Sequence, residues 1–317
     1  MKSVRYLVIV SLVLAVLCVL SYLAAAPYAI TPFVNSILIL ALPLALGVYL
    51  YRYLKADWRI FGLGMLTFIG SQVLHLPFNN WSLLPVLESI GLGADSPPGS
   101  LQLAAFAVIV GLSSGVFEET ARYIVYSRWL EKARSWNGGL MFGAGHGGVE
   151  ALIVGVIVLL TFLQALTIRN GDMSQLPPEQ VEAALAFSDA YWNSPWYAFL
   201  LPLLERISAI IFHLSAALLV LQAFTRRNIL WYFAAILLHT LFNALAVFGL
   251  VTWGPYIAEG LILFTALFSL WIIFALRTEE DLTPIDDALG TNLSKLKNVQ
   301  STPDSLTTEK LEDSRYD

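Results

Sequence analysis

Long apolar runs separated by short polar segments fill most of the chain, and this pattern predicts membrane-spanning helices. A helix needs about 20 apolar residues to cross the ~30 Å hydrocarbon core of a bilayer. Eight runs approach or exceed that length, and they cover residues 6–26, 33–54, 60–76, 101–126, 137–166, 196–224, 229–251 and 256–276. We therefore expect an all-α, polytopic membrane protein with eight transmembrane helices.

Basic residues beside the ends of these runs predict the orientation of the helices. With the N-terminus in the cytoplasm, eleven Lys and Arg residues flank the spans on the cytoplasmic side, whereas Arg169 alone flanks them on the other side. The eleven are Lys2, Arg5, Arg52, Lys55, Arg59, Arg128, Lys132, Arg134, Arg226, Arg227 and Arg277. Because positive residues mark the cytoplasmic side, we expect both termini to be cytoplasmic and the protein to lie in the inner or plasma membrane.

The two ends of the chain raise further expectations. Lys2 and Arg5 before the first run, and the alanines at 24–26 that end it, are typical of a secretory signal, but the length of the run favours an uncleaved anchor. After Arg277 the sequence is acidic and rich in Ser and Thr, which is typical of disorder. We expect a membrane domain over residues 1–277 and an acidic, disordered cytoplasmic tail over residues 278–317.

Two segments on the predicted non-cytoplasmic side are long. Residues 77–100 contain Trp and Pro but no basic residue, and their apolar content predicts that they lie along the membrane interface or dip back into it. Residues 167–194 are polar and acidic. We expect the second segment to be a water-exposed loop.

Composition excludes several classes of protein. Hydrophobic residues make up 57% of the sequence and charged residues 13%, whereas an ordinary soluble domain has about 25% charged residues. The single cysteine, Cys18, permits neither an intrachain disulfide nor a cysteine-based metal cluster. The sequence has no Gly-rich phosphate loop and no nucleic-acid signature. We therefore expect the protein to contact the lipid bilayer and to bind no nucleic acid.

Three charged residues interrupt the fourth apolar run. Glu118, Glu119 and Arg122 follow one another closely in an otherwise apolar segment. A charge at the bilayer centre costs about 2.5–3.5 kcal/mol by the lowest estimates. In a helix, Arg122 shares a face with Glu118 at i+4 and with Glu119 at i+3. An ion pair that only locks helix packing is one interpretation, but polar groups at the same depth in other runs favour a functional site.

All four histidines of the chain, His75, His146, His213 and His239, lie in predicted spans. Glu118 and the last three of these histidines each lie ten or eleven residues from the cytoplasmic end of their span, which corresponds to about 15 Å along an α-helix. Four consecutive spans thus present an ionisable group at one level. We expect a four-helix polar catalytic core within residues 101–251, and we expect His75, near the other end of its span, to pack or to cap a helix.

Two of these histidines have polar companions on their own helices. Glu150 follows His146 by four residues, and Asn243 follows His239 by the same spacing. Histidine nitrogens and carboxylate oxygens are ligands of catalytic zinc, which keeps one position open for water. A carboxylate in a dry pocket is a good general base, and an asparagine can stabilise a developing oxyanion. These residue types predict peptide hydrolysis within the membrane.

Three motifs in a fixed order resemble those of known membrane proteases. The motifs are Glu118-Glu119-x-x-Arg122, Phe142-x-x-x-His146 and His239-x-x-x-Asn243. They are similar to the motifs of the CAAX prenyl endopeptidase and bacteriocin-processing (CPBP) family, although that family usually spaces its Arg four residues after the second Glu. The extension His146-Gly-Gly-x-Glu150 and the separate His213 are more similar to the YhfC family of intramembrane metalloproteases, which is related to the CPBP and PrsW proteases.

The residues and the resemblance together predict an intramembrane peptidase that acts on a peptide or membrane-protein substrate through a water activated by Glu118. The predicted catalytic residues are Glu118, Glu119, Arg122 and Asn243. The predicted metal ligands are His146, Glu150, His213 and His239. The sequence leaves open whether the glutamate acts with a metal or alone, and three histidines at one level favour Zn²⁺. The depth of the motifs predicts access from the cytoplasmic leaflet.

Other functions fit part of this pattern. An ion or metal transporter also uses intramembrane acids and histidines, but the inverted repeats and interrupted helices of many transporters are not visible in the sequence. A haem protein would use His213 and His239 but would leave Glu118, Glu119 and Arg122 without a role. A non-catalytic membrane scaffold built on a protease-like fold also stays open.

Overall fold

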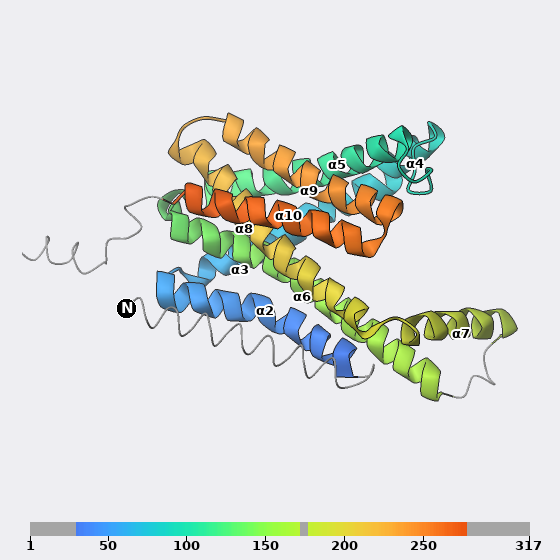
Figure 1. Ribbon diagram of the computed structural model, residues 1–317. Coiled ribbons are helices and arrows are strands. Elements are labelled where there is room, and N and C mark those ends of the chain that lie inside the picture. Colours follow the sequence, from blue (N-terminus) through green and yellow to red (C-terminus); the bar gives the residue numbers. More distant parts are fainter. Residues whose placement is uncertain (1–29, 172–176, 278–317) are drawn as a thin grey trace, which may run out of the picture. The chain divides into compact units, whose positions relative to one another are not determined.

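The computed structural model describes residues 30–171 and 177–277, and this part of the chain consists of helices and connecting turns (Figure 1). The elements are α2 (Ile30–Leu54), α3 (Trp58–Phe78), the π-helix η1 (Asn79–Leu83), α4 (Leu84–Ser89), α5 (Leu101–Arg128), the 3₁₀-helix η2 (Glu131–Ala133), α6 (Trp136–Asn170), α7 (Pro178–Trp192), the 3₁₀-helix η3 (Trp196–Leu200), α8 (Leu201–Thr225), α9 (Leu230–Trp253) and α10 (Pro255–Ala275). All belong to one compact unit that ends at Leu276.

Seven helical segments in the described residues are long and apolar enough to cross a membrane. They are Ile30–Leu54, Trp58–Ser89, Leu101–Arg128, Trp136–Asn170, Trp196–Thr225, Leu230–Trp253 and Pro255–Ala275. Each coincides with one of the predicted runs from residue 33 onward, so the protein is an all-α, polytopic membrane protein. The predicted span at 6–26 and the predicted tail at 278–317 lie outside the described residues. The count of eight spans, the orientation and the domain boundaries therefore stay predictions.

The structure corrects the prediction for residues 77–100, because the helix does not end at Pro77. The chain stays helical to Ser89 through the π-helix η1. A π-turn lets a helix absorb a local irregularity without breaking. Pro85 then falls in the first turn of α4, where its missing N–H is tolerated. Residues 77–89 therefore extend the α3 segment instead of forming a loop.

The second long segment, residues 167–194, is also more ordered than predicted. α6 continues to Asn170, and α7 adds four helical turns with Pro178 at its first position. Trp192 at the end of α7 packs on α6, with its ring 6.5 Å from that of Phe162 and the guanidinium of Arg169 4.6 Å above it. The polar composition of this segment correctly predicted that it is exposed, but it did not predict the helix α7.

Glycines allow the backbones of neighbouring helices to touch. A Cβ at Gly64 of α3 would lie 2.2 Å from the Phe142 carbonyl oxygen of α6, and one at Gly145 would lie 2.0 Å from the Phe61 carbonyl oxygen. At Gly111 of α5 a Cβ would lie 2.7 Å from a carbonyl oxygen of α9. Small residues permit such close approach in membrane helices. These contacts fix α3 against α6 and α5 against α9.

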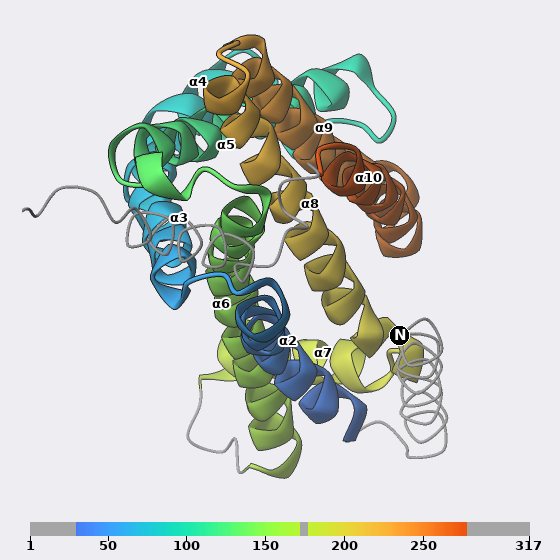
Figure 2. The ribbon, with the colours of Figure 1, turned by 90° about the vertical axis from the view of Figure 1, so that its left-hand side faces the viewer.

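α8 is the central helix of the bundle. The apolar window of its span is 83% buried, compared with 22–44% in the other six. Figure 2 views the bundle along its length, with α8 between α6 on one side and α9 and α10 on the other. The helix ends joined by residues 55–57, 129–135 and 226–229 are here called the basic end. The opposite end, which carries α4, α7 and Gly254, is called the far end (Figure 1).

Candidate functional site

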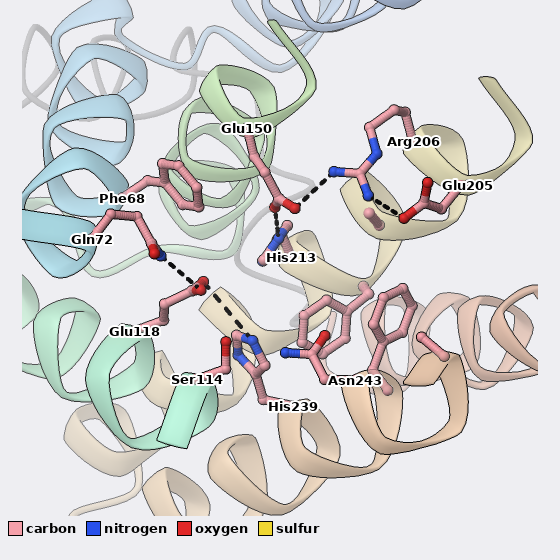
Figure 3. Close-up of a pocket in the computed structure, with 14 residues that line it drawn as sticks. Phe68, Gln72, Ser114, Glu118, Glu150, Glu205, Arg206, His213, His239 and Asn243 are labelled. Carbon is pink, nitrogen blue, oxygen red and sulfur yellow. Dashed lines mark hydrogen bonds and ion pairs between the residues drawn. The ribbon is translucent and has the colours of Figure 1, made fainter. Parts of the chain in front are cut away.

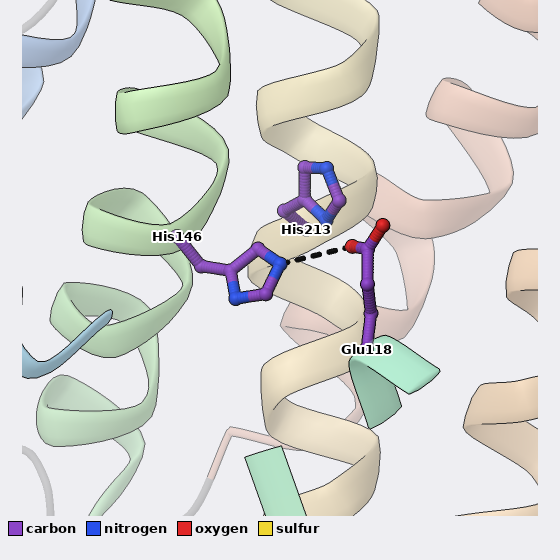
Figure 4. A group of neighbouring side chains, drawn as sticks. All are labelled: Glu118, His146 and His213. Carbon is purple, nitrogen blue, oxygen red and sulfur yellow. Dashed lines mark hydrogen bonds and ion pairs between the residues drawn. The ribbon is translucent and has the colours of Figure 1, made fainter. Parts of the chain in front are cut away.

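Glu118 of α5 is buried where α3, α5, α6 and α9 meet. Its Oε2 lies 2.9 Å from Nε2 of His146 on α6 (Figure 4), and its Oε1 accepts a 3.0 Å hydrogen bond from Nε2 of Gln72 on α3. Nε2 of His239, on α9, lies 3.9 Å from Oε2. One carboxylate therefore contacts side chains from three other helices.

His239 is held in a defined orientation by the next glutamate along α5. Its Nδ1 lies 2.7 Å from Oε1 of Glu119, and Glu119 also forms a fully buried ion pair with Arg122. A carboxylate paired with Arg only accepts hydrogen bonds, so Nδ1 carries the hydrogen. Nε2 of His239 then faces Oε2 of Glu118 at 3.9 Å. This is the carboxylate–histidine arrangement that orients histidines in metal sites.

His213 of α8 has a partner on both ring nitrogens. Nη2 of Arg122 lies 2.7 Å from its Nδ1, and Oε2 of Glu150 lies 2.6 Å from its Nε2. Because a guanidinium only donates, Nδ1 must accept and Nε2–H must donate to Glu150. His213 would have to release one of these two partners to bind a metal.

A second ion-pair group continues from Glu150 toward the far end. Nη1 of Arg206 lies 2.7 Å from Oε1 of Glu150, and its Nη2 lies 2.5 Å from Oε1 of Glu205. The side chains of Glu150 and Glu205 are 26% and 35% exposed, whereas those of Glu119 and Arg122 are fully buried. The polar network therefore runs from a closed interior at Arg122 to an accessible group at Glu205.

Three of these residues form a group that fits a metal ion. Glu118, His146 and His213 each offer one ligand atom, and the three atoms lie within 4.8 Å of one another. Two imidazoles and one carboxylate are a ligand set of catalytic zinc. Nδ1 of His146 is buried without a hydrogen-bond partner among the described residues. The donor chemistry of the group therefore fits Zn²⁺.

The structure groups the predicted site residues differently from the prediction. Glu118, the predicted base, lies in the potential ligand group, whereas Glu150 and His239, two predicted ligands, lie outside it. Glu150 contacts His213 and Arg206, and His239 contacts Glu119. Glu119 and Arg122 pair with each other, as the spacing indicated. Which of these residues bind a metal or take part in catalysis stays a prediction.

A pocket of about 280 Å³ reaches two members of the potential ligand group, Glu118 and His213 (Figure 3). Its lining comprises Phe68, Gln72, Ser114, Glu118, Glu150, Glu205, Arg206, Ala209, Phe212, His213, His239, Phe242, Asn243 and Ala246. Asn243 and Ser114 face it without a hydrogen bond to any described residue. The lining residues extend from Glu118 toward the far end, which is the non-cytoplasmic end only in the predicted orientation, so access from the cytoplasmic leaflet stays a prediction.

Gln72 and Ser114 are among the pocket residues that sequence reasoning missed. Gln72 ends a chain of hydrogen bonds in which Ser113 donates to Asn79 Oδ1 at 2.8 Å and Asn79 Nδ2 meets His75 Nε2 at 2.9 Å. His75 Nδ1 lies 3.3 Å from Gln72 Oε1, which leaves the Gln72 amide nitrogen for Glu118. His75 thus supports the site indirectly. Its spacing of three residues from Gln72 was the signal in the sequence.

Comparison with known proteins identifies the family of this chain. The model of a family described as YhfC intramembrane metalloprotease matches residues 38–262. The "Uncharacterized membrane protein YhfC" of Bacillus subtilis (strain 168) is 32% identical over 243 residues, which cover 74% of this chain and 92% of that protein. No solved structure matches. The family match includes every residue of the candidate site, and the chain belongs to the YhfC family of intramembrane metalloproteases.

Proposed function

We propose that this protein is a zinc-dependent peptidase of the cell membrane that hydrolyses a peptide bond of a membrane-embedded peptide or protein. One observation carries the proposal. A buried carboxylate and two imidazoles from three helices have ligand atoms within 4.8 Å of one another, and two of these residues, Glu118 and His213, line a pocket of about 280 Å³. If these residues served only to pack the helices together, we would not expect a pocket beside them.

Glu118, His146 and His213 are the residues that would hold the metal. Zinc, when bound, would supply Lewis acidity that polarises a peptide carbonyl and activates water. His239 would stay beside Glu118, oriented by Glu119 and Arg122. Such supporting contacts orient ligands and tune their basicity.

Glu150 is the carboxylate available as general base if Glu118 is a ligand. Its side chain lines the pocket and is partly exposed, whereas that of Glu119 is fully buried in its ion pair. In the proposed reaction, the water oxygen attacks the carbonyl carbon while Glu150 takes a water proton. Glu150 then gives this proton to the amine nitrogen as the C–N bond breaks. Asn243 and Ser114 can donate to the carbonyl oxygen as its negative charge develops.

Metal content and cleavage, measured together on the purified full chain, test these roles. After zinc loading we expect about one zinc ion per chain in the wild type, and loss of zinc and cleavage in Glu118→Gln, His146→Ala and His213→Ala. Glu150→Gln should keep the zinc but lose about 10²–10⁴-fold in kcat on reconstituted reporter peptides. Glu205→Gln, which changes a neighbouring pocket carboxylate, is the matched control and should keep both.

Two outcomes would contradict the proposal. A wild-type protein that binds no zinc after loading would remove the metal from the mechanism. Zinc flux into proteoliposomes that Glu118→Gln abolishes, in a protein that cleaves no reporter, would favour the transporter, which uses the same intramembrane residues.

A further inference from the structure

We infer that a substrate polypeptide reaches Glu118 from the far end of the bundle, as an extended segment, and that the basic end is closed to it. That the pocket takes a substrate polypeptide rests on the proposed function. The direction of access rests on how the helices are packed on the two sides of the site.

On α8 and α9 the other lining residues lie on the far-end side of His213 and His239. On α8 the lining residues Arg206 and Ala209 precede His213, on the side of the helix end that leads to α7. On α9 the lining residues Asn243 and Ala246 follow His239 toward Gly254. Figure 3 shows the two walls, with Glu150, Arg206 and Glu205 on one and Ser114, His239 and Asn243 on the other. The pocket therefore opens toward the far end.

Large side chains fill the opposite side of the site. Tyr126 of α5 and Phe142 of α6 are fully buried, with their rings edge to face at 4.9 Å. Leu218 of α8 is also fully buried, and a Cβ at Gly139 of α6 would lie only 2.7 Å from it. Protein interiors packed in this way leave few voids as large as a water molecule. Between Arg122 and the basic end, the described helices leave no route for a peptide.

The chemistry of the pocket favours an extended segment. An extended segment presents backbone N–H and C=O groups that a helix satisfies internally. Ser114 and Asn243 are free to bond these groups, beside the stacked rings of Phe212 and Phe242.

This direction of access determines where a substrate is cut. In the predicted orientation the far end is the non-cytoplasmic end. The scissile bond then enters from the outer half of the membrane, and a segment presented only at the cytoplasmic surface is not a substrate.

Cysteine accessibility tests this direction without any assay of catalysis. Cys18 is the single cysteine of the chain, so Cys18→Ser gives a clean background. Ala209 and Ala217 lie on one face of α8, four residues before and four residues after His213, and both are buried. Because a thiol reacts according to its access to the reagent, we expect Ala209→Cys to react with a charged methanethiosulfonate at least about tenfold faster than Ala217→Cys.

Applying the reagent to one face of oriented vesicles identifies the open end. Asn193→Cys, at the end of α7, and Asn228→Cys, in the turn before α9, mark the two exposed ends. Ala209→Cys should react from the same face as Asn193→Cys. A second pair on α9, Ala246→Cys and Ala235→Cys, should repeat the result if a cysteine on α8 disturbs folding.

Two results would overturn the inference. Faster reaction at Ala217 and Ala235, from the face that labels Asn228→Cys, would place the opening at the basic end. Lack of reaction at both Ala209 and Ala246 in inserted protein would mean that the pocket is closed to water. Zinc-dependent cleavage could persist in either case, so failure of the access route is distinguishable from failure of the proposed peptidase.

Discussion

The two sides of Glu118 are built from the same helices but are packed in different ways. Toward the basic end, α5, α6 and α8 contribute fully buried side chains such as Tyr126, Phe142 and Leu218. Toward the far end, the same helices line a pocket with charged and unbonded polar groups. One side packs tightly against the candidate site, and the other side leaves a pocket beside it. A site inside a membrane needs both, because it must be rigid and must still admit water.

The ion pairs of Arg122 and Arg206 differ in burial in the same way as the two sides of Glu118. Arg122 and its partner Glu119 are fully buried, whereas Arg206 binds two carboxylates that are 26% and 35% exposed. Solvent can reach the partners of Arg206, whereas Arg122 and its partner are fully buried. The following predictions test whether stability resides on the closed side and function on the open side, beginning with the largest expected effect.

The largest effect is expected at the contact between α3 and α6. A methyl group at Gly64 would lie 2.2 Å from a backbone carbonyl oxygen, whereas one at Gly62, on the same helix, would meet nothing within 4 Å. Overpacking usually costs 1–3 kcal/mol, and a rigid backbone contact should cost more than about 3 kcal/mol. Gly64→Ala should therefore lose folded protein in detergent, measured by thermal unfolding, and Gly62→Ala should not. Equal Tm values for the two variants would refute the tight contact.

Next in size is the difference between the arginines. Arg122→Gln leaves the buried Glu119 with His239 but without its guanidinium partner, and breaking a buried ion pair costs roughly 3–5 kcal/mol. Arg206→Gln removes a partly exposed pair and should cost about 1–2 kcal/mol, between the buried and the surface cases. Chemical unfolding of both variants under one condition gives the comparison. A larger loss in Arg206→Gln would reverse our assignment of the closed and open sides.

A smaller, functional effect is expected at Gln72. Gln72→Leu keeps the approximate shape of the side chain but removes the 3.0 Å hydrogen bond to Glu118. Supporting contacts of this kind are worth 10–100-fold in activity or metal affinity, so kcat or zinc affinity should fall by about that factor while Tm changes little. Val73→Leu, at a lipid-facing neighbour that is 66% exposed, is the control. A fall in Tm without a functional loss would make Gln72 a packing residue.

The smallest effect is expected at two helix caps, one at each end of the bundle. Ser100 caps α5 at the far end, and Ser135 caps α6 at the basic end, each through a 3.1 Å bond to a backbone N–H. Replacing either with Ala should cost about 1 kcal/mol. Since a cap is a local interaction, the two losses should be similar by thermal unfolding. A clear difference would mean that the two ends differ in more than side-chain packing.

The fold was predictable where hydrophobicity determines it. The runs at 33–54, 101–126 and 229–251 agree with α2, α5 and α9 to within three residues at each end. Prediction failed where a residue type is compatible with more than one local structure. Pro77 was taken as the end of a helix, although the π-helix after it allows the chain to continue to Ser89. Residues 178–192 were taken as loop because a short exposed helix has no apolar run to reveal it.

The depth of the candidate site in the membrane was predictable, but the side-chain contacts between its helices were not. Spacing within a helix placed Glu118, His146, His213 and His239 at one level, and the structure brings these side chains together. Which nitrogen faces which oxygen depends on how the helices cross, and the sequence of one helix does not contain that information. Gln72 was overlooked because an uncharged polar residue in an apolar run is less conspicuous than a charge.

The glycine contacts between α3 and α6 have a consequence for the alignment of the site. Gly145 is the immediate neighbour of His146, and Gly64 is one turn from Phe68, whose ring meets the His146 ring edge to face at 5.2 Å. The spacing of the two helices at this point is set by main-chain atoms, which cannot adjust as side chains do. How far the His146 ring can shift is therefore determined by Gly64 and Gly145, which carry no side chain. One added methyl group at either position would displace the ring while hardly changing the hydrophobicity of the chain.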